Sequence, residues 1–82
     1  MTIKILGAGC ARCESLEKMT RKAVAELQLD ATVEKIGDIQ EILGYEVIST
    51  PGLVIDEKVI FSGRVPKMTE LKSLLLSYSQ AV

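Results

Sequence analysis

The chain has 82 residues, 48% of them hydrophobic, and its ten basic and eleven acidic residues give a net charge of −1. A chain of this length buries one modest core, so we expect a single domain over residues 1–82. The charge balance argues against nucleic acid as a partner. The lack of a long apolar run or signal peptide argues against a membrane and favours a cytoplasmic location.

The first half of the chain predicts a strand, a long helix and a second strand. Residues 2–6 are apolar at three of five positions, and we interpret them as a strand buried on both faces. Over residues 11–29, apolar residues recur at steps of three and four, which is typical of an amphipathic helix. Residues 31–36 predict the second strand, and Glu34 and Lys35 suit a position at the edge of a sheet.

The second half predicts a short helix, a hairpin and a final helix, over residues 38–44, 53–61 and 66–78. Asp38 and Glu41 have the spacing of a capping box, which indicates the start of the short helix. Pro66 suits the first turn of the final helix, whose apolar stripe follows it.

This order of elements, β-α-β-α-β-β-α, predicts an α/β fold. A right-handed crossover makes the first two strands parallel, and the late hairpin adds an antiparallel pair. We therefore expect a four-stranded mixed sheet with helices on both faces.

Cys10 and Cys13 are the only cysteines, and they lie where the first strand gives way to the long helix. A C-x-x-C pair at the first turn of a helix places both thiols on one helix face, close enough to form a disulfide. So short a loop adds only ~2 kcal/mol through chain entropy, so stabilisation is a poor explanation for the pair. In the cytoplasm such a pair is redox-active or binds metal, and a redox couple is our leading hypothesis.

Two further features make the chain resemble the thioredoxin and glutaredoxin superfamily. Gly9-Cys10-Ala11-Arg12-Cys13 follows a strand, and Thr50-Pro51 precedes the late hairpin. With the opening Gly7-Ala8-Gly9 and with Gly63-Arg64-Val65 after the last strand, the chain most resembles the small thioredoxin-like "redox-active disulfide protein 2" family of archaea and bacteria. It lacks the tryptophan before the first cysteine and the Gly-Pro dipeptide of thioredoxins.

The resemblance implies a thioredoxin-like (glutaredoxin-type) fold and a thiol-disulfide oxidoreductase that reduces protein or small-molecule disulfides without a cofactor. Cys10, at the helix N-terminus, is expected to have a lowered pKa and to attack the substrate. Arg12 adds a positive charge beside it. Cys13 is expected to resolve the mixed disulfide.

The resemblance also implies a cis bond between Thr50 and Pro51, which leaves the Thr50 backbone free to pair with an extended substrate segment. We expect Ala11 and Arg12 to complete the substrate-binding surface. The implied partners of this monomer are disulfide-containing proteins and an electron donor such as a thioredoxin-reductase-like flavoprotein.

The alternative is a soft-metal carrier that uses the same two cysteines. Two thiolates suit Cu(I), and soft-metal chaperones also open with a strand, a glycine, C-x-x-C and a long helix. Those chaperones end on a strand, whereas residues 71–78 here have a helical pattern, so the order of elements favours the redox function. We expect no closed zinc site, because two cysteines without a histidine do not supply the usual four ligands.

Overall fold

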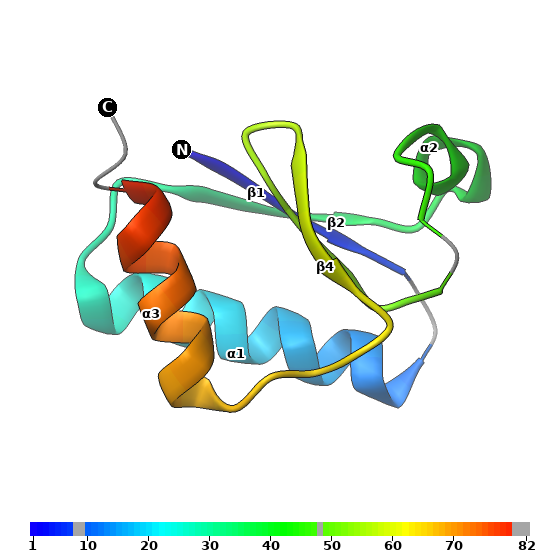
Figure 1. Cartoon of the computed structure of the whole chain (residues 1–82). Coiled ribbons are helices and arrows are strands. Elements are labelled where there is room, and N and C mark those ends of the chain that lie inside the picture. Colours follow the sequence, from blue (N-terminus) through cyan, green and yellow to red (C-terminus); the bar gives the residue numbers. More distant parts are fainter. Residues whose placement is uncertain (8–9, 48, 80–82) are drawn as a thin grey trace.

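Four strands and three helices follow one another along residues 1–7, 10–47 and 49–79, the part of the chain that the computed structural model describes (Figure 1). The elements are β1 (Thr2–Leu6), α1 (Ala11–Leu27), β2 (Thr32–Ile36), α2 (Ile39–Gly44), β3 (Gly52–Ile55), β4 (Lys58–Ser62) and α3 (Met68–Ser79). The predicted order of elements is confirmed.

The strands form one mixed sheet in the order β2-β1-β3-β4. β1 runs parallel to β2, with Thr2 opposite Thr32, and antiparallel to β3, with Ile3 opposite Ile55. β3 and β4 form the antiparallel hairpin. The apolar strand β1 is therefore central, and β2, which carries Glu34 and Lys35, lies at an edge, as the sequence predicted.

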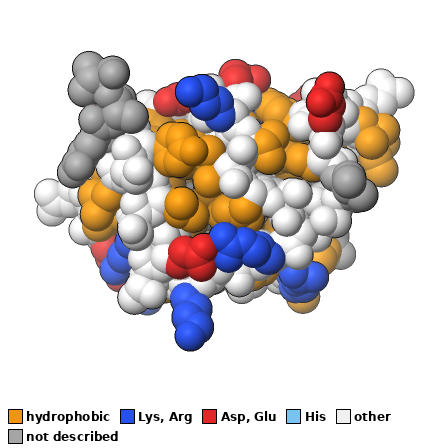
Figure 2. Space-filling view, viewed as in Figure 1, with side chains coloured by type: hydrophobic (Ala, Val, Ile, Leu, Met, Phe, Trp, Pro, Cys, Tyr) orange, Lys and Arg blue, Asp and Glu red, His pale blue; other side chains and the backbone are white. Residues whose placement is uncertain are grey.

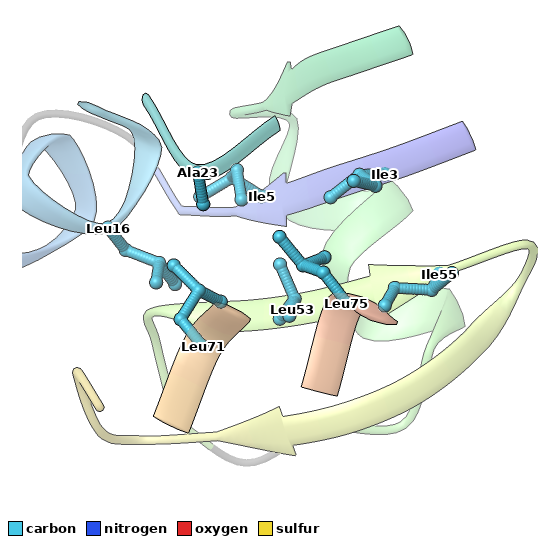
Figure 3. Packing of buried hydrophobic residues seen from close by; sticks show 8 residues of the cluster. All are labelled: Ile3, Ile5, Leu16, Ala23, Leu53, Ile55, Leu71 and Leu75. Atoms are coloured by element: carbon cyan, nitrogen blue, oxygen red, sulfur yellow. The ribbon is translucent and has the colours of Figure 1, made fainter. Parts of the chain in front are cut away.

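The main core lies on the face of the sheet that α1 and α3 cover together. Side chains from β1, β3, α1 and α3 interdigitate there, and all of its members are at most 1% exposed (Figure 3). They are Ile3, Ile5, Leu16, Ala23, Leu53, Ile55, Leu71 and Leu75. Burial of this apolar surface is the main force that holds the two helices on the sheet.

The opposite face carries α2 and a smaller cluster of Leu6, Ile42 and Val54. Because side chains alternate along a strand, Leu6 and Ile5 point to opposite faces, so helices cover both sides of the sheet as predicted. Figure 1 shows α2 apart from the pair α1 and α3. In the same view, hydrophobic side chains gather on the surface between α3 and the hairpin, among charged ones (Figure 2).

Helix ends differ from the predictions by one or two residues. α1 ends at Leu27, because Gln28 takes a left-handed conformation (φ 54°) and its N–H bonds back to Ala25. α3 begins at Met68, and the carbonyl of Lys67 accepts its first backbone hydrogen bond, so Pro66 lies just before the helix.

The start of α2 also differs in detail. The Asp38 carboxylate caps this helix, but it accepts a hydrogen bond from the N–H of Gln40 (2.8 Å), whereas in a capping box it would accept one from the N–H of Glu41.

No helix in the described residues is both long and apolar enough to span a bilayer.

Candidate active site

Cys10 is the N-cap residue of α1. Its backbone is extended (φ −125°, ψ 136°), and its carbonyl accepts the N–H of Glu14 at 3.0 Å, so the helix begins directly behind it. The preceding residues of the motif, Ala8 and Gly9, lie outside the described part of the chain. Cys10 is half-buried, which leaves its sulfur within reach of another molecule.

The pKa of the Cys10 thiol is lowered. The backbone N–H of Cys13 is the largest cause, followed by the Cys13 thiol and the N–H of Arg12, and the charge of Arg12 adds less. The Cys10 side chain itself forms no capping hydrogen bond to the helix. The stabilisation is therefore that of a thiolate facing the unpaired N–H dipoles of a helix N-terminus.

Cys13 lies one turn into the helix and is 1% exposed. Burial is the main cause that raises the pKa of its thiol, and the neighbouring Cys10 sulfur raises it further. The Thr50 side chain and the charge of Lys35 oppose this increase without reversing it. Both cysteines are free thiols in this structure, and their pKa values move in opposite directions.

Thr50 lies beside the buried Cys13, and Pro51 follows it in the chain. The Thr50–Pro51 peptide bond is cis, as the resemblance implied, and Pro51 is fully buried while Thr50 is exposed. Among the described residues, no backbone hydrogen bond joins Thr50 to another residue. The addition of a strand from another chain uses backbone N–H and C=O groups of this kind.

Gly7, named above only as part of the Gly7-Ala8-Gly9 opening, lies close to both Cys13 and Thr50. Its φ is +122°, and a Cβ atom placed there would lie 2.6 Å from Cys13 Sγ and 3.1 Å from Thr50 Cβ. Only a residue without a side chain lets β1 end so close to both groups. The signal in the sequence was a glycine directly after a buried strand and shortly before the first cysteine.

Arg12 contacts the loop that follows β4. Its guanidinium donates a hydrogen bond to the Gly63 carbonyl (3.0 Å), and the Gly63 N–H donates to the Pro51 carbonyl (2.8 Å). The side chain thus links the first turn of α1 to the loop after β4, and through that loop to the cis proline. Ala11, the remaining residue between the cysteines, is exposed.

A cavity of about 350 Å³ opens beside these groups, between α2 and the loop that carries Thr50. Gly7 and Thr50 form its wall on the side of Cys13. No group of three or more His, Cys, Asp or Glu side chains suited to a metal ion occurs among the described residues.

Comparison with known sequences adds three findings. A sequence model of the family described as "Thioredoxin domain" matches residues 1–76. A protein named thioredoxin from Methanothermobacter thermautotrophicus is 44% identical over 75 residues, which is 92% of this chain and 97% of that protein. Another thioredoxin, from Methanocaldococcus jannaschii, is 38% identical over 78 residues, which is 95% of this chain and 90% of that one.

Among solved structures, the germline-specific thioredoxin Deadhead of Drosophila melanogaster superposes with a TM-score of 0.64. The alignment covers 93% of this chain and 78% of that chain at 18% identity, so the likeness concerns the fold alone.

Proposed function

The chain belongs to the thioredoxin family and is a thioredoxin-like thiol-disulfide oxidoreductase, and from this premise we propose that Cys10 and Cys13 form its redox couple. The observation that supports this assignment is the opposite shift in pKa of two thiols one helical turn apart. A thiol with a lowered pKa is a thiolate more of the time, and the thiolate is the nucleophile.

In the proposed reaction the Cys10 thiolate attacks one sulfur of the substrate disulfide. The substrate S–S bond breaks, a mixed disulfide with Cys10 forms, and the other substrate sulfur leaves as a thiolate that takes up a proton. The Cys13 thiol then loses its proton and attacks Cys10 Sγ, which releases the second substrate thiol. Two electrons have passed to the substrate, and Cys10 and Cys13 are joined by a disulfide.

Thr50, Pro51, Ala11 and Arg12 form the proposed substrate-binding surface. The open backbone of Thr50 would pair with an extended segment around the substrate disulfide, and the exposed Ala11 would lie beside it. Arg12 would position this surface, because its hydrogen bond to the Gly63 carbonyl joins the first turn of α1 to the loop after β4.

Thioredoxins act on disulfide substrates and are reduced by thioredoxin reductase. We propose that residues 1–82 work as one domain in the cytoplasm, where thiols are kept reduced, with a flavoprotein of the reductase type as electron donor.

The soft-metal alternative has no support in the comparisons, because both relatives are named thioredoxins. The helix α3 near the end of the chain also lies where the soft-metal chaperones have a strand.

The test is to trap the intermediate. A Cys13→Ser variant should accumulate a mixed disulfide between Cys10 and a disulfide substrate such as insulin, because the resolving thiol is missing. The matched Cys10→Ser variant should trap nothing and reduce no insulin. Equal trapping by the two variants, or insulin reduction by the Cys10→Ser variant, would refute the assigned roles.

A further inference from the structure

Arg12 differs from the other two arginines of the chain in what its guanidinium binds. Arg21 and Arg64 each form an ion pair with a carboxylate, at 3.0 Å and 2.5 Å. Arg12 forms no ion pair among the described residues, and its Nη2 donates instead to a neutral group, the Gly63 carbonyl, at 3.0 Å. A guanidinium has five N–H donors, so a single bond to a carbonyl leaves the others for another molecule.

The charge of Arg12 lies at the edge of the proposed substrate-binding surface. Arg12 is exposed in the first turn of α1, two residues after Cys10. Its anchor, Gly63, donates a backbone hydrogen bond to the Pro51 carbonyl at 2.8 Å, so the guanidinium is tied both to the helix that begins at Cys10 and to the backbone next to Thr50. A substrate segment that pairs with Thr50 while its sulfur faces Cys10 therefore passes close to this charge.

The bond to Gly63 prepares the guanidinium for a ligand. An exposed ion pair usually adds little to binding, because holding a long side chain in place costs entropy. Here the bond to Gly63 already holds the side chain, so part of that cost falls on the fold and not on binding. Glu14, exposed in the same helical turn, forms no ion pair with Arg12 in the described part of the chain, so the charge is available to a carboxylate that the substrate brings.

We propose that Arg12 selects protein disulfides in which an acidic residue flanks the reactive cysteine, by binding the carboxylate of that residue. The proposal rests on the function proposed above and adds a substrate class to it. The ion pair acts on binding alone, and the S–S bond is the only substrate bond that breaks. A segment with a lysine at the same place meets a like charge and binds less well.

The experiment compares three disulfide-bridged peptides that differ only at the residues flanking each cysteine, which are aspartate, asparagine or lysine. The rate on each peptide is divided by its rate with dithiothreitol, which measures the reactivity of the peptide disulfide by itself. The wild-type protein should then reduce the aspartate peptide with a kcat/KM about threefold higher than the asparagine peptide, the effect of an exposed ion pair, and the lysine peptide most slowly.

Two features of this preference separate an ion pair from other causes. The difference between the peptides should lie in KM, because the ion pair is the same in the ground state and the transition state. It should also shrink when the ionic strength rises from about 0.01 M to about 1 M, because the Debye length falls from about 30 Å to about 3 Å.

Arg12→Gln should abolish the preference, and Arg12→Lys should keep part of it, because lysine retains the charge without the planar fork. The ratio between peptides is the readout, since loss of the bond to Gly63 is expected to slow the reduction of every peptide. The matched control is Lys22→Gln, which removes the same charge from an exposed position on α1, about 15 Å further along the helix, and it should keep the preference.

Equal normalised kcat/KM on the aspartate and asparagine peptides would overturn the role of Arg12 and leave the redox couple standing. A preference that survives in Arg12→Gln, or that does not fall with ionic strength, would do the same. Failure of the wild-type protein to reduce the three peptides and bis(2-hydroxyethyl) disulfide would instead overturn the proposed function, and this inference with it.

Discussion

At the scale of single residues, the two thiols differ because they lie at different depths in the same helix. Cys10 is the N-cap and faces unpaired N–H groups, whereas Cys13 is 1% exposed beneath Thr50 and Gly7. The first setting favours the charged form of a thiol and the second favours the neutral form. One turn of helix is enough to shift the pKa values of the two thiols in opposite directions, as the proposed attacking and resolving roles require.

This difference should be measurable by alkylation of the reduced protein. Since the pKa of Cys10 is lowered and that of Cys13 is raised, Cys10 should be largely thiolate at a pH where Cys13 is not. Its alkylation by iodoacetamide should rise with pH through a midpoint below the ordinary thiol value of about 8.5, and Cys13 should react only at higher pH. Peptide mapping after brief treatment at each pH separates the two, and preferential modification of Cys13 near neutrality would contradict the assignment.

Gly7 gives a second prediction at this scale. Gly7→Ala should lower the free energy of unfolding by about 1–3 kcal/mol and slow disulfide reduction, because the new Cβ meets Cys13 Sγ at a φ of +122°. Gly44→Ala is the matched control, since a Cβ there has nothing within 4 Å, and it should be neutral or slightly stabilising. Urea denaturation of both variants gives the comparison, and equal stabilities would show that the close approach is unimportant.

At the scale of elements, a polar cluster holds the end of α2 against the sheet. Lys4 Nζ, on β1, donates to the hydroxyl of Tyr45 at 3.0 Å and to the carboxylate of Glu57 at 2.7 Å. The Tyr45 hydroxyl in turn donates to Glu57 at 3.2 Å. Tyr45 is the C-cap of α2 and Glu57 lies in the β3–β4 turn, so the cluster joins three elements.

Removal of the Tyr45 hydroxyl should loosen α2. In Tyr45→Phe, the amide protons of α2 should exchange with solvent faster than in the wild type, while those of α1 keep their rates, because the lost bonds hold α2 alone. The control Tyr78→Phe, at an exposed position on α3, should leave the α2 rates unchanged. Unaltered exchange in Tyr45→Phe would mean that packing of Ile42 holds the helix without the cluster.

The elements were predictable because their signals are local. Apolar periodicity indicated α1 and the central strand β1, and Asp38 marked the start of α2. The errors at the helix ends were local too. A residue type such as Gln28 does not reveal that it takes the left-handed conformation that ends α1, and an aspartate such as Asp38 can cap either of two backbone N–H groups. Cys10, Cys13 and Thr50-Pro51 could be named as candidates for the same reason, because they form short motifs.

The remaining features of the site depend on residues that are distant in sequence. The bond from Arg12 to Gly63, the approach of Gly7 to Thr50, and the cavity beneath α2 arise only when the strands are assembled. No spacing or composition encodes such contacts, so sequence analysis could name the reacting groups but not the surface around them.

At the scale of the whole molecule, the site is held in place by the packing of α1 and α3 on one face of the sheet. Leu71 of α3 and Leu16 of α1 are both fully buried in that core, so packing against the core fixes the helix that carries the cysteines. Leu71→Ala should lower the free energy of unfolding by about 2–5 kcal/mol. Leu76→Ala, at a site that is 38% exposed, should change it by only about 0.5 kcal/mol. Similar losses in the two variants, measured by urea denaturation, would contradict this description of the core.

We propose that Cys10 and Cys13 interconvert reversibly between dithiol and disulfide. The most direct measurement equilibrates the wild-type protein in dithiothreitol and glutathione redox buffers and quantifies the Cys10–Cys13 disulfide by mass spectrometry. We predict one reversible two-electron transition that disappears in both Cys10→Ser and Cys13→Ser. A protein that stays fully reduced across the whole buffer range would contradict the account.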